Sequence, residues 1–143
     1  MPQNLKEKPK SKTEEYTYAI GRRKTATARI RLFKKSGDMI VNGMAVGKYF
    51  SGEVAQALYM KPFVVTGKVG KFSYTVKTEG SGKMSQLGAV SHALSRALTI
   101  VDTDAYKSLL KKAGLLTRDS RMKESRKVGT GGKARRKKQS PKR

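Results

Sequence analysis

The chain contains no cysteine and no tryptophan, one histidine, and only ten acidic residues against 33 lysines and arginines. The lack of cysteine excludes disulfides, thiolate chemistry and cysteine-bound zinc. His92 has no second histidine with which to bind a metal or relay protons, so we expect it to be a structural or surface residue. The few carboxylates show no paired spacing of the kind that general acid–base catalysis needs. We therefore predict that the protein is not an enzyme and has no metal or cofactor.

Long apolar runs are also missing from this chain. None approaches the roughly 18 residues that a membrane span needs. Residues 1–12 lack the apolar stretch of a secretory signal. We expect a cytosolic protein, or the mature form of an organelle protein, with no membrane partner.

Positive charge is abundant, and its distribution divides the chain into three parts. The net charge is +23 over 143 residues. Residues 1–15 hold four basic and three acidic side chains, residues 16–116 hold 17 and five, and residues 117–143 hold 12 and two. We predict a flexible arm, a folded basic domain and an extended basic tail over these ranges. A basic domain with an even more basic tail indicates nucleic acid as the partner.

The last sixteen residues, VGTGGKARRKKQSPKR, contain seven lysines and arginines and no acidic residue. Such a segment cannot bury enough apolar surface to fold alone, and its charge favours a polyanion. Composition alone leaves a solvated tail or a nuclear-import patch as alternatives. Three glycines at the start suggest a flexible tether, and Pro141 stiffens an end thin enough to enter a narrow RNA cleft.

Alternating apolar and polar residues predict a half-buried strand over residues 25–33, with Arg29 and Arg31 on its outer face. Further strands are predicted over residues 39–41, 63–65 and 71–79. Apolar spacing predicts a helix that follows Val46 and ends before Pro62, a clear helix over residues 84–101, and a third helix that begins near Asp102 and stops at Gly114. The expected fold is an α+β two-layer sandwich, with helices on one face of a mostly antiparallel four-stranded sheet.

Three motifs in the domain have a functional and a structural interpretation. The run GRRKT at residues 21–25 suits phosphate binding, or is an ordinary solvated strand entry. Residues 80–85, GSGKMS, precede a helix but fail the ATP-binding phosphate loop, since Lys77 stands where glycine is needed. The helix start could still hold an RNA phosphate, or be a tight turn. Phe72 and Tyr74 could stack bases, but core packing is favoured.

Four ordered blocks of this sequence resemble the family of small-ribosomal-subunit protein nine. They are residues 18–29 (YAIGRRKTATAR), residues 39–43 (MIVNG) with 49–50 (YF), residues 80–98 (GSGKMSQLGAVSHALSRAL), and residues 116–127 (LTRDSRMKESRK) with 133–136 (KARR). The resemblance implies the ribosomal α+β sandwich with a left-handed βαβ crossover. It also implies a structural protein of the cytoplasmic ribosome, with neighbouring ribosomal proteins of the subunit head as partners.

The resemblance also implies which residues bind RNA. The domain would pack on small-subunit rRNA, and the tail tip would contact the anticodon stem-loop of peptidyl-site tRNA. The expected tRNA-binding residues are Ser140, Lys142 and Arg143. The expected rRNA-binding residues are Arg22, Arg23, Lys24, Arg29, Arg31, Lys83, Arg118, Arg121, Arg126, Lys127, Lys133, Arg135, Arg136, Lys137 and Lys138.

Two features depart from the family pattern. Ser81 replaces one of three usual glycines, and serine fits a turn. Bacterial members commonly end in Gln, an aromatic residue, Ser, Lys and Arg, whereas here the aromatic is absent and Pro141 separates Ser140 from Lys142. A free RNA-binding or chaperone-like protein outside the ribosome remains the alternative function. A phosphotransferase with the same architecture is disfavoured by the failed phosphate loop.

Overall fold

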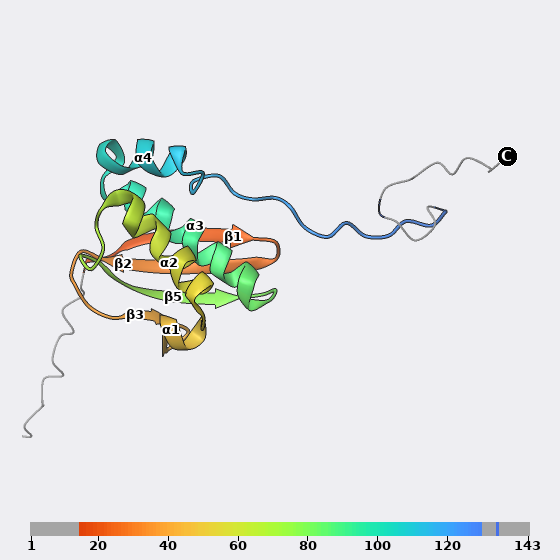
Figure 1. Cartoon of the computed structure of the whole chain (residues 1–143), viewed down its shortest axis with the longest axis horizontal. Coiled ribbons are helices and arrows are strands. Elements are labelled where there is room, and N and C mark those ends of the chain that lie inside the picture. The colour runs from red at the N-terminus through yellow and green to blue at the C-terminus, as the bar shows by residue number, and fades with distance from the viewer. Residues whose placement is uncertain (1–14, 130–133, 135–143) are drawn as a thin grey trace, which may run out of the picture.

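The computed structural model describes residues 15–129 and residue 134. This part of the chain folds into a mixed α+β domain in which helices lie on one face of a five-stranded sheet (Figure 1). The elements, in chain order, are β1 (Thr17–Arg23), β2 (Ala26–Phe33), β3 (Met39–Val41), β4 (Met44–Ala45), α1 (Val46–Tyr49), α2 (Glu53–Thr66), β5 (Ser73–Glu79), α3 (Lys83–Val101) and α4 (Thr103–Lys112).

The sheet has the strand order β1-β2-β5-β3-β4. The β1–β2, β2–β5 and β3–β4 pairs are antiparallel, whereas β3 and β5 run parallel. The general α+β expectation is therefore confirmed, but the predicted count of four strands is wrong. The sequence patterns missed β1 and the two-residue strand β4, and they predicted a strand at residues 63–65 that does not exist.

Residues 63–65 are instead the last part of α2, which continues past Pro62 to Thr66. Proline removes one helical hydrogen bond, so local propensity predicts a stop there. Burial outweighs this cost. The Phe63 ring is 1% exposed and stacks on Phe72 and Tyr74, with centroid separations of 6.3 and 6.1 Å. The helix ends at Gly67, whose φ of 65° gives the left-handed cap that glycine adopts most easily.

A close contact between β1 and α3 fixes the outer strand of the sheet against the helix layer. A β-carbon added at Gly21 would lie 2.1 Å from the Ala89 carbonyl oxygen and 2.3 Å from the Ala93 nitrogen. Only glycine fits at this position. Alanines on α3 are fully buried along the same contact, so the backbones of strand and helix approach directly.

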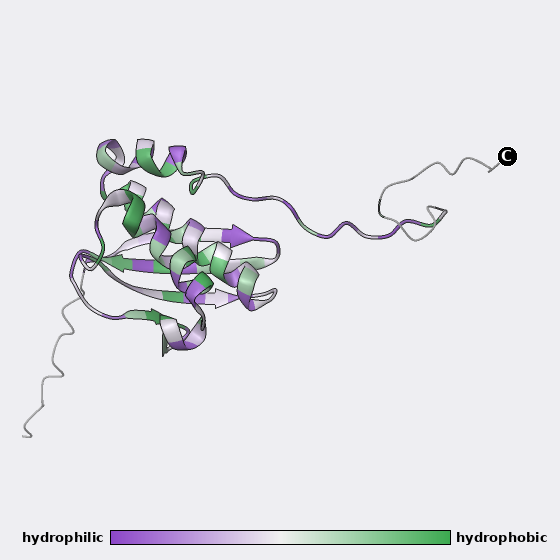
Figure 2. Cartoon of the chain, in the orientation of Figure 1, coloured by the Kyte–Doolittle hydropathy of each residue, from purple (hydrophilic) through white to green (hydrophobic). Residues whose placement is uncertain are grey.

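The core lies between the helices and the sheet face that they cover. Ile30, Leu32, Val76, Leu94 and Leu98 are each at most 1% exposed. Phe72 and Tyr74 are also buried, which confirms the core interpretation over the base-stacking one. Burial raises the pKa of the Tyr74 phenol, and the nearby Tyr59 raises it further. In Figure 2, apolar colours run along strands and helices, while the segment after α4 is largely hydrophilic.

Candidate nucleic-acid interface

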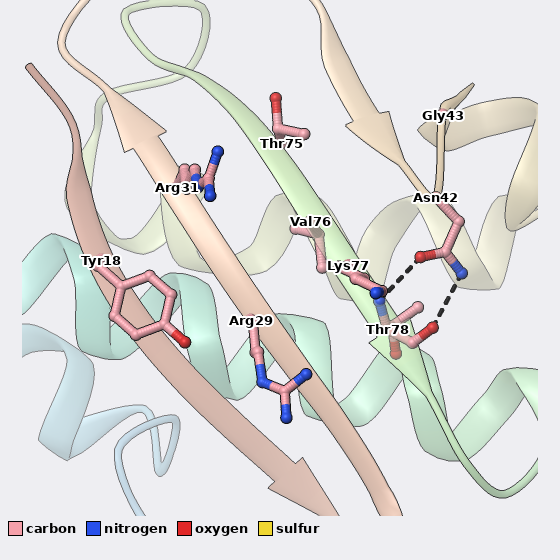
Figure 3. Close-up of a pocket in the computed structure, with 9 residues that line it drawn as sticks. All are labelled: Tyr18, Arg29, Arg31, Asn42, Gly43, Thr75, Val76, Lys77 and Thr78. Atoms are coloured by element: carbon pink, nitrogen blue, oxygen red, sulfur yellow. Dashed lines mark hydrogen bonds between the residues drawn. The ribbon is translucent and has the colours of Figure 1, made fainter. Parts of the chain in front are cut away.

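The sheet face opposite the helices is uncovered in the described part of the chain. We call it the open face, and define it by the outward residues of β1, β2, β3 and β5. Alternation along the strands places buried and exposed side chains on opposite faces. The face contains a hollow of about 690 Å³, shown in Figure 3. Its lining residues are Tyr18, Arg29, Arg31, Asn42, Gly43, Thr75, Val76, Lys77 and Thr78.

The strand register brings positive charges together on the open face. Arg29 on β2 lies directly opposite Lys77 on β5, and Arg31 lies opposite Thr75. Like charges placed directly across a strand pair destabilise a sheet. Glu79 partly offsets this repulsion, because its Oε1 lies 3.0 Å from Arg29 Nη1. The pair is about half exposed on both sides, so it remains accessible to a competing anion.

Sequence patterns predicted Arg29 and Arg31 on an outer strand face, and the structure places them there. They did not single out Lys77 or Tyr18 as site residues. Tyr18 lies on β1 opposite Arg31 and is 47% exposed. Figure 3 shows Tyr18, Arg29 and Arg31 on neighbouring strands beside the hollow. Recognising β1 as a strand would have placed Tyr18 on the same face as the two arginines.

A second basic region surrounds the point where the chain leaves the domain. We call residues 116–121 the tail root. His92 connects this root to β1: its Nδ1 accepts the Arg22 backbone N–H at 3.3 Å, and its Nε2 lies 3.2 Å from the Leu116 carbonyl oxygen. This pattern fits a neutral ring that donates from Nε2. Of the two alternatives expected for His92, a structural or a surface residue, these contacts favour the structural one.

The environment of His92 favours its neutral form. Burial lowers the pKa of the imidazole, and the nearby guanidinium groups of Arg96 and Arg118 lower it further. The hydrogen bond to Leu116 acts in the opposite direction but is outweighed. The imidazole therefore holds the root to β1 without adding charge near neutral pH.

Arg23 and Asp119 form the second attachment of the tail root. Arg23 Nη2 lies 3.2 Å from Asp119 Oδ2, and Nη1 donates to the Arg121 carbonyl oxygen. Asp119 also accepts hydrogen bonds from Arg121, with Oδ2 2.8 Å from Nη2. These bonds from Arg121 lower the pKa of the Asp119 carboxyl well below its usual range. Arg23 is thus engaged with the root in this structure, and its predicted rRNA contact stays a prediction.

The other predicted residues around the root lie close to this region or along its extension. Arg22 and Lys24 are exposed, and Lys24 adopts a left-handed φ of 53° in the β1–β2 turn. Arg118 Nη2 donates to the Lys24 carbonyl oxygen at 3.3 Å. Beyond the root, residues 122–129 form no helix or strand, and Arg126 and Lys127 are exposed there. Figure 1 shows this segment running away from the domain.

The glycine-rich turn before α3 is a separate feature. Gly82 is the N-cap of α3 and makes no side-chain cap. Lys83 begins the helix, with its ammonium 5.5 Å from the centre of the Tyr49 ring. Ser81 has a φ of 51°, a left-handed backbone conformation that glycine adopts more readily. The serine that departs from the family pattern therefore lies where glycine is favoured. Phosphate binding at this helix start stays a prediction.

Eight predicted RNA-binding residues lie outside the described part of the chain. They are Lys133, Arg135, Arg136, Lys137, Lys138, Ser140, Lys142 and Arg143. Among the described residues, no three His, Asp or Glu side chains are grouped so that they could hold a metal ion. No helix within residues 15–129 is both long and apolar enough to cross a membrane.

Comparison with known proteins identifies the family. The family model described as "Ribosomal protein S9/S16" matches residues 21–143. The small ribosomal subunit protein uS9 of Maridesulfovibrio salexigens is 44% identical over 120 residues, covering 84% of this chain and 92% of that protein. The protein of the same name from Desulfovibrio desulfuricans is 44% identical over 117 residues, covering 82% and 89%. The chain therefore belongs to the ribosomal protein S9/S16 family, as its motifs predicted, and is a structural protein of the small ribosomal subunit rather than an enzyme.

Proposed function

We propose that the folded domain binds rRNA in the head of the small subunit of the cytoplasmic ribosome, beside neighbouring ribosomal proteins. The observation that carries this proposal is the register of the open face, where Arg29 and Lys77 are held opposite each other. A sheet without a polyanionic partner gains nothing from two adjacent cations. Phosphate groups of RNA turn this repulsion into binding energy, because each neutralised phosphate releases counterions.

We also propose that the C-terminal tail contacts the anticodon stem-loop of peptidyl-site tRNA through Ser140, Lys142 and Arg143. Support comes from family membership and from the tail root. Attachments through His92 and Asp119 fix where the chain leaves the domain. A fixed exit limits the volume that a basic tail searches, which raises its effective concentration at a nearby target. Phosphate contacts carry no base code, as a site that accepts every tRNA requires.

For the fold, we propose that the crossover from β3 through α2 to β5 is left-handed, as the resemblance implies. Support comes from the parallel pairing of β3 and β5 and from the view in Figure 1, where both strands point to the right, β5 lies above β3 and the connecting helix α2 lies in front of the sheet, which is the left-handed sense.

The tail proposal is tested by deleting Lys142 and Arg143 and measuring how long tRNA remains at the peptidyl site of purified small subunits. A matched control replaces Lys10 and Lys12 of the N-terminal arm with glutamine, which removes the same charge elsewhere. We expect faster tRNA release only from the tail variant, with normal subunit assembly in both. Equal release from the two variants and the parent would contradict the tail contact.

A further inference from the structure

We propose that Tyr18 is a stacking platform for an unpaired base of the RNA that lies across the open face. The inference rests on the proposed rRNA binding and adds the kind of nucleotide contact made there. Phosphate contacts position an RNA, whereas a base needs an aromatic surface or hydrogen-bonding groups. Tyr18 supplies such a surface at the edge of the basic hollow.

The Tyr18 ring is accessible. Its exposed fraction is 47%, and it lies on the sheet face opposite the described helices (Figure 1). Among the described residues, neither a second aromatic ring nor a cation contacts the Tyr18 ring. The neighbouring Tyr16 differs: its ring meets Phe33 at 6.0 Å and lies 5.2 Å from the Arg31 guanidinium. Tyr16 thus has a packing role, and Tyr18 has none that these contacts supply.

Basic residues lie on the strands beside Tyr18. Arg31 lies directly opposite Tyr18, and Arg29 lies opposite Ile20, the next residue of β1 on the same face. Lys77 continues the basic row onto β5. Sites for single-stranded nucleic acid combine such cations with an aromatic ring, because the cations hold the backbone while the bases stack. The hollow of about 690 Å³ falls within the range of sites that hold small ligands.

The absence of tryptophan allows a direct test in the full-length chain. Tyr18→Trp introduces the only tryptophan of the chain at the proposed platform. Its emission can be excited separately from that of the tyrosines, and base stacking quenches it. The probes are a single-stranded adenosine oligonucleotide, an RNA duplex of the same length, polyphosphate and polyglutamate. Val64→Trp is the matched control, since Val64 is 63% exposed on α2, in the helix layer.

We expect the single-stranded RNA to quench the emission of the Tyr18→Trp variant, and polyphosphate, the duplex and polyglutamate to leave it nearly unchanged. The Val64→Trp emission should respond to none of them. Equal quenching by polyphosphate and RNA, or a response to polyglutamate alone, would overturn the proposal; the latter would indicate an acidic protein partner. Filter binding of small-subunit rRNA to the Tyr18→Trp variant and to the parent chain separates the stacking site from the proposed rRNA binding. Retained rRNA binding without quenching overturns the stacking site only, whereas loss of binding by the parent chain overturns the proposed function.

Two affinity variants separate stacking from a structural role. Tyr18→Phe keeps the ring, and Tyr18→Leu keeps apolar bulk without it. We expect the leucine variant to lose about tenfold in its preference for single-stranded RNA over polyphosphate, and the phenylalanine variant to keep that preference. Circular dichroism checks that both variants fold. A leucine variant that folds and keeps the full preference contradicts the inference.

Discussion

Replacing Glu79 with glutamine should strengthen RNA binding. Glu79 is the only acidic residue on β1, β2 and β5, and its carboxylate accepts a hydrogen bond from the Arg29 guanidinium. The amide keeps the shape of the side chain but removes the charge. Arg29 then becomes available to one further phosphate. Because the ion pair is exposed, its loss changes the free energy of unfolding by less than about 1 kcal/mol.

The magnitude follows from counterion release. One additional phosphate contact makes the slope of log affinity against log salt more negative by about 0.7 for single-stranded RNA. When the salt concentration is lowered from 1 M to 0.1 M, the affinity of the variant should therefore rise about fivefold more than that of the parent chain. Lys77→Gln, on the same strand and the same face, should change the slope by a similar amount in the opposite direction.

The assay is fluorescence anisotropy of a labelled single-stranded RNA, titrated with the parent chain and each variant from 0.1 to 1 M salt. Glu53→Gln provides the control, because it removes one exposed acidic charge from the start of α2 in the helix layer. We expect a smaller effect from it. The reasoning is refuted when Glu79→Gln and Glu53→Gln give the same slope, or when Lys77→Gln leaves the slope unchanged.

Three further predictions concern stability and the tail root. Gly21→Ala should destabilise the domain by about 3 kcal/mol in urea titrations, because the added methyl group meets backbone atoms of α3, whereas Gly47→Ala, with no atom closer than 3.9 Å, should be nearly neutral. The pKa of His92 is lowered in the folded state, so the free energy of unfolding should fall as the pH decreases through about 6.5, the pKa of histidine in the unfolded chain. Urea midpoints of the parent chain should therefore differ between pH 5 and 7.5, and His92→Gln should lose this difference. Asp119→Asn should loosen the tail root, and trypsin should then cleave within residues 116–127 faster than in the parent chain.

Clear outcomes would contradict each of these three predictions. Equal urea midpoints for the two glycine variants would show that β1 and α3 can separate without cost. A parent-like pH dependence in His92→Gln would assign the titration to another group. Unchanged cleavage in Asp119→Asn would mean that the remaining contacts, those of His92 and Arg118, hold the root without the ion pair.

Local patterns predicted β2, β5 and α3 because each has one face that packs on the core and follows the period of its element. They missed β1 for a physical reason. Its helix-facing residues, Ala19 and Gly21, are small because α3 lies so close, while the larger Tyr18 and Ile20 point to the open face. The usual relation between size and burial is thus inverted along this strand.

The candidate site was predictable to the extent that it follows alternation along one strand. Arg29 and Arg31 share the outer face of β2, and the pattern of residues 25–33 indicates this directly. The partnership of Arg29 with Lys77 depends on the register between β2 and β5, which local patterns do not determine. The pairing of Arg23 with Asp119 joins residues 96 positions apart, and only the fold brings them together.

We propose that the open face, rather than the helix layer, is the rRNA-binding surface of the domain. Lysine acylation followed by mass spectrometry, on the free protein and on purified small subunits, tests it most directly. Lys77 represents the open face, and the exposed Lys107 and Lys111 represent α4. We predict that Lys77 loses most of its reactivity in the subunit while the two α4 lysines keep theirs. A Lys77 as reactive in subunits as in the free protein would contradict the claim.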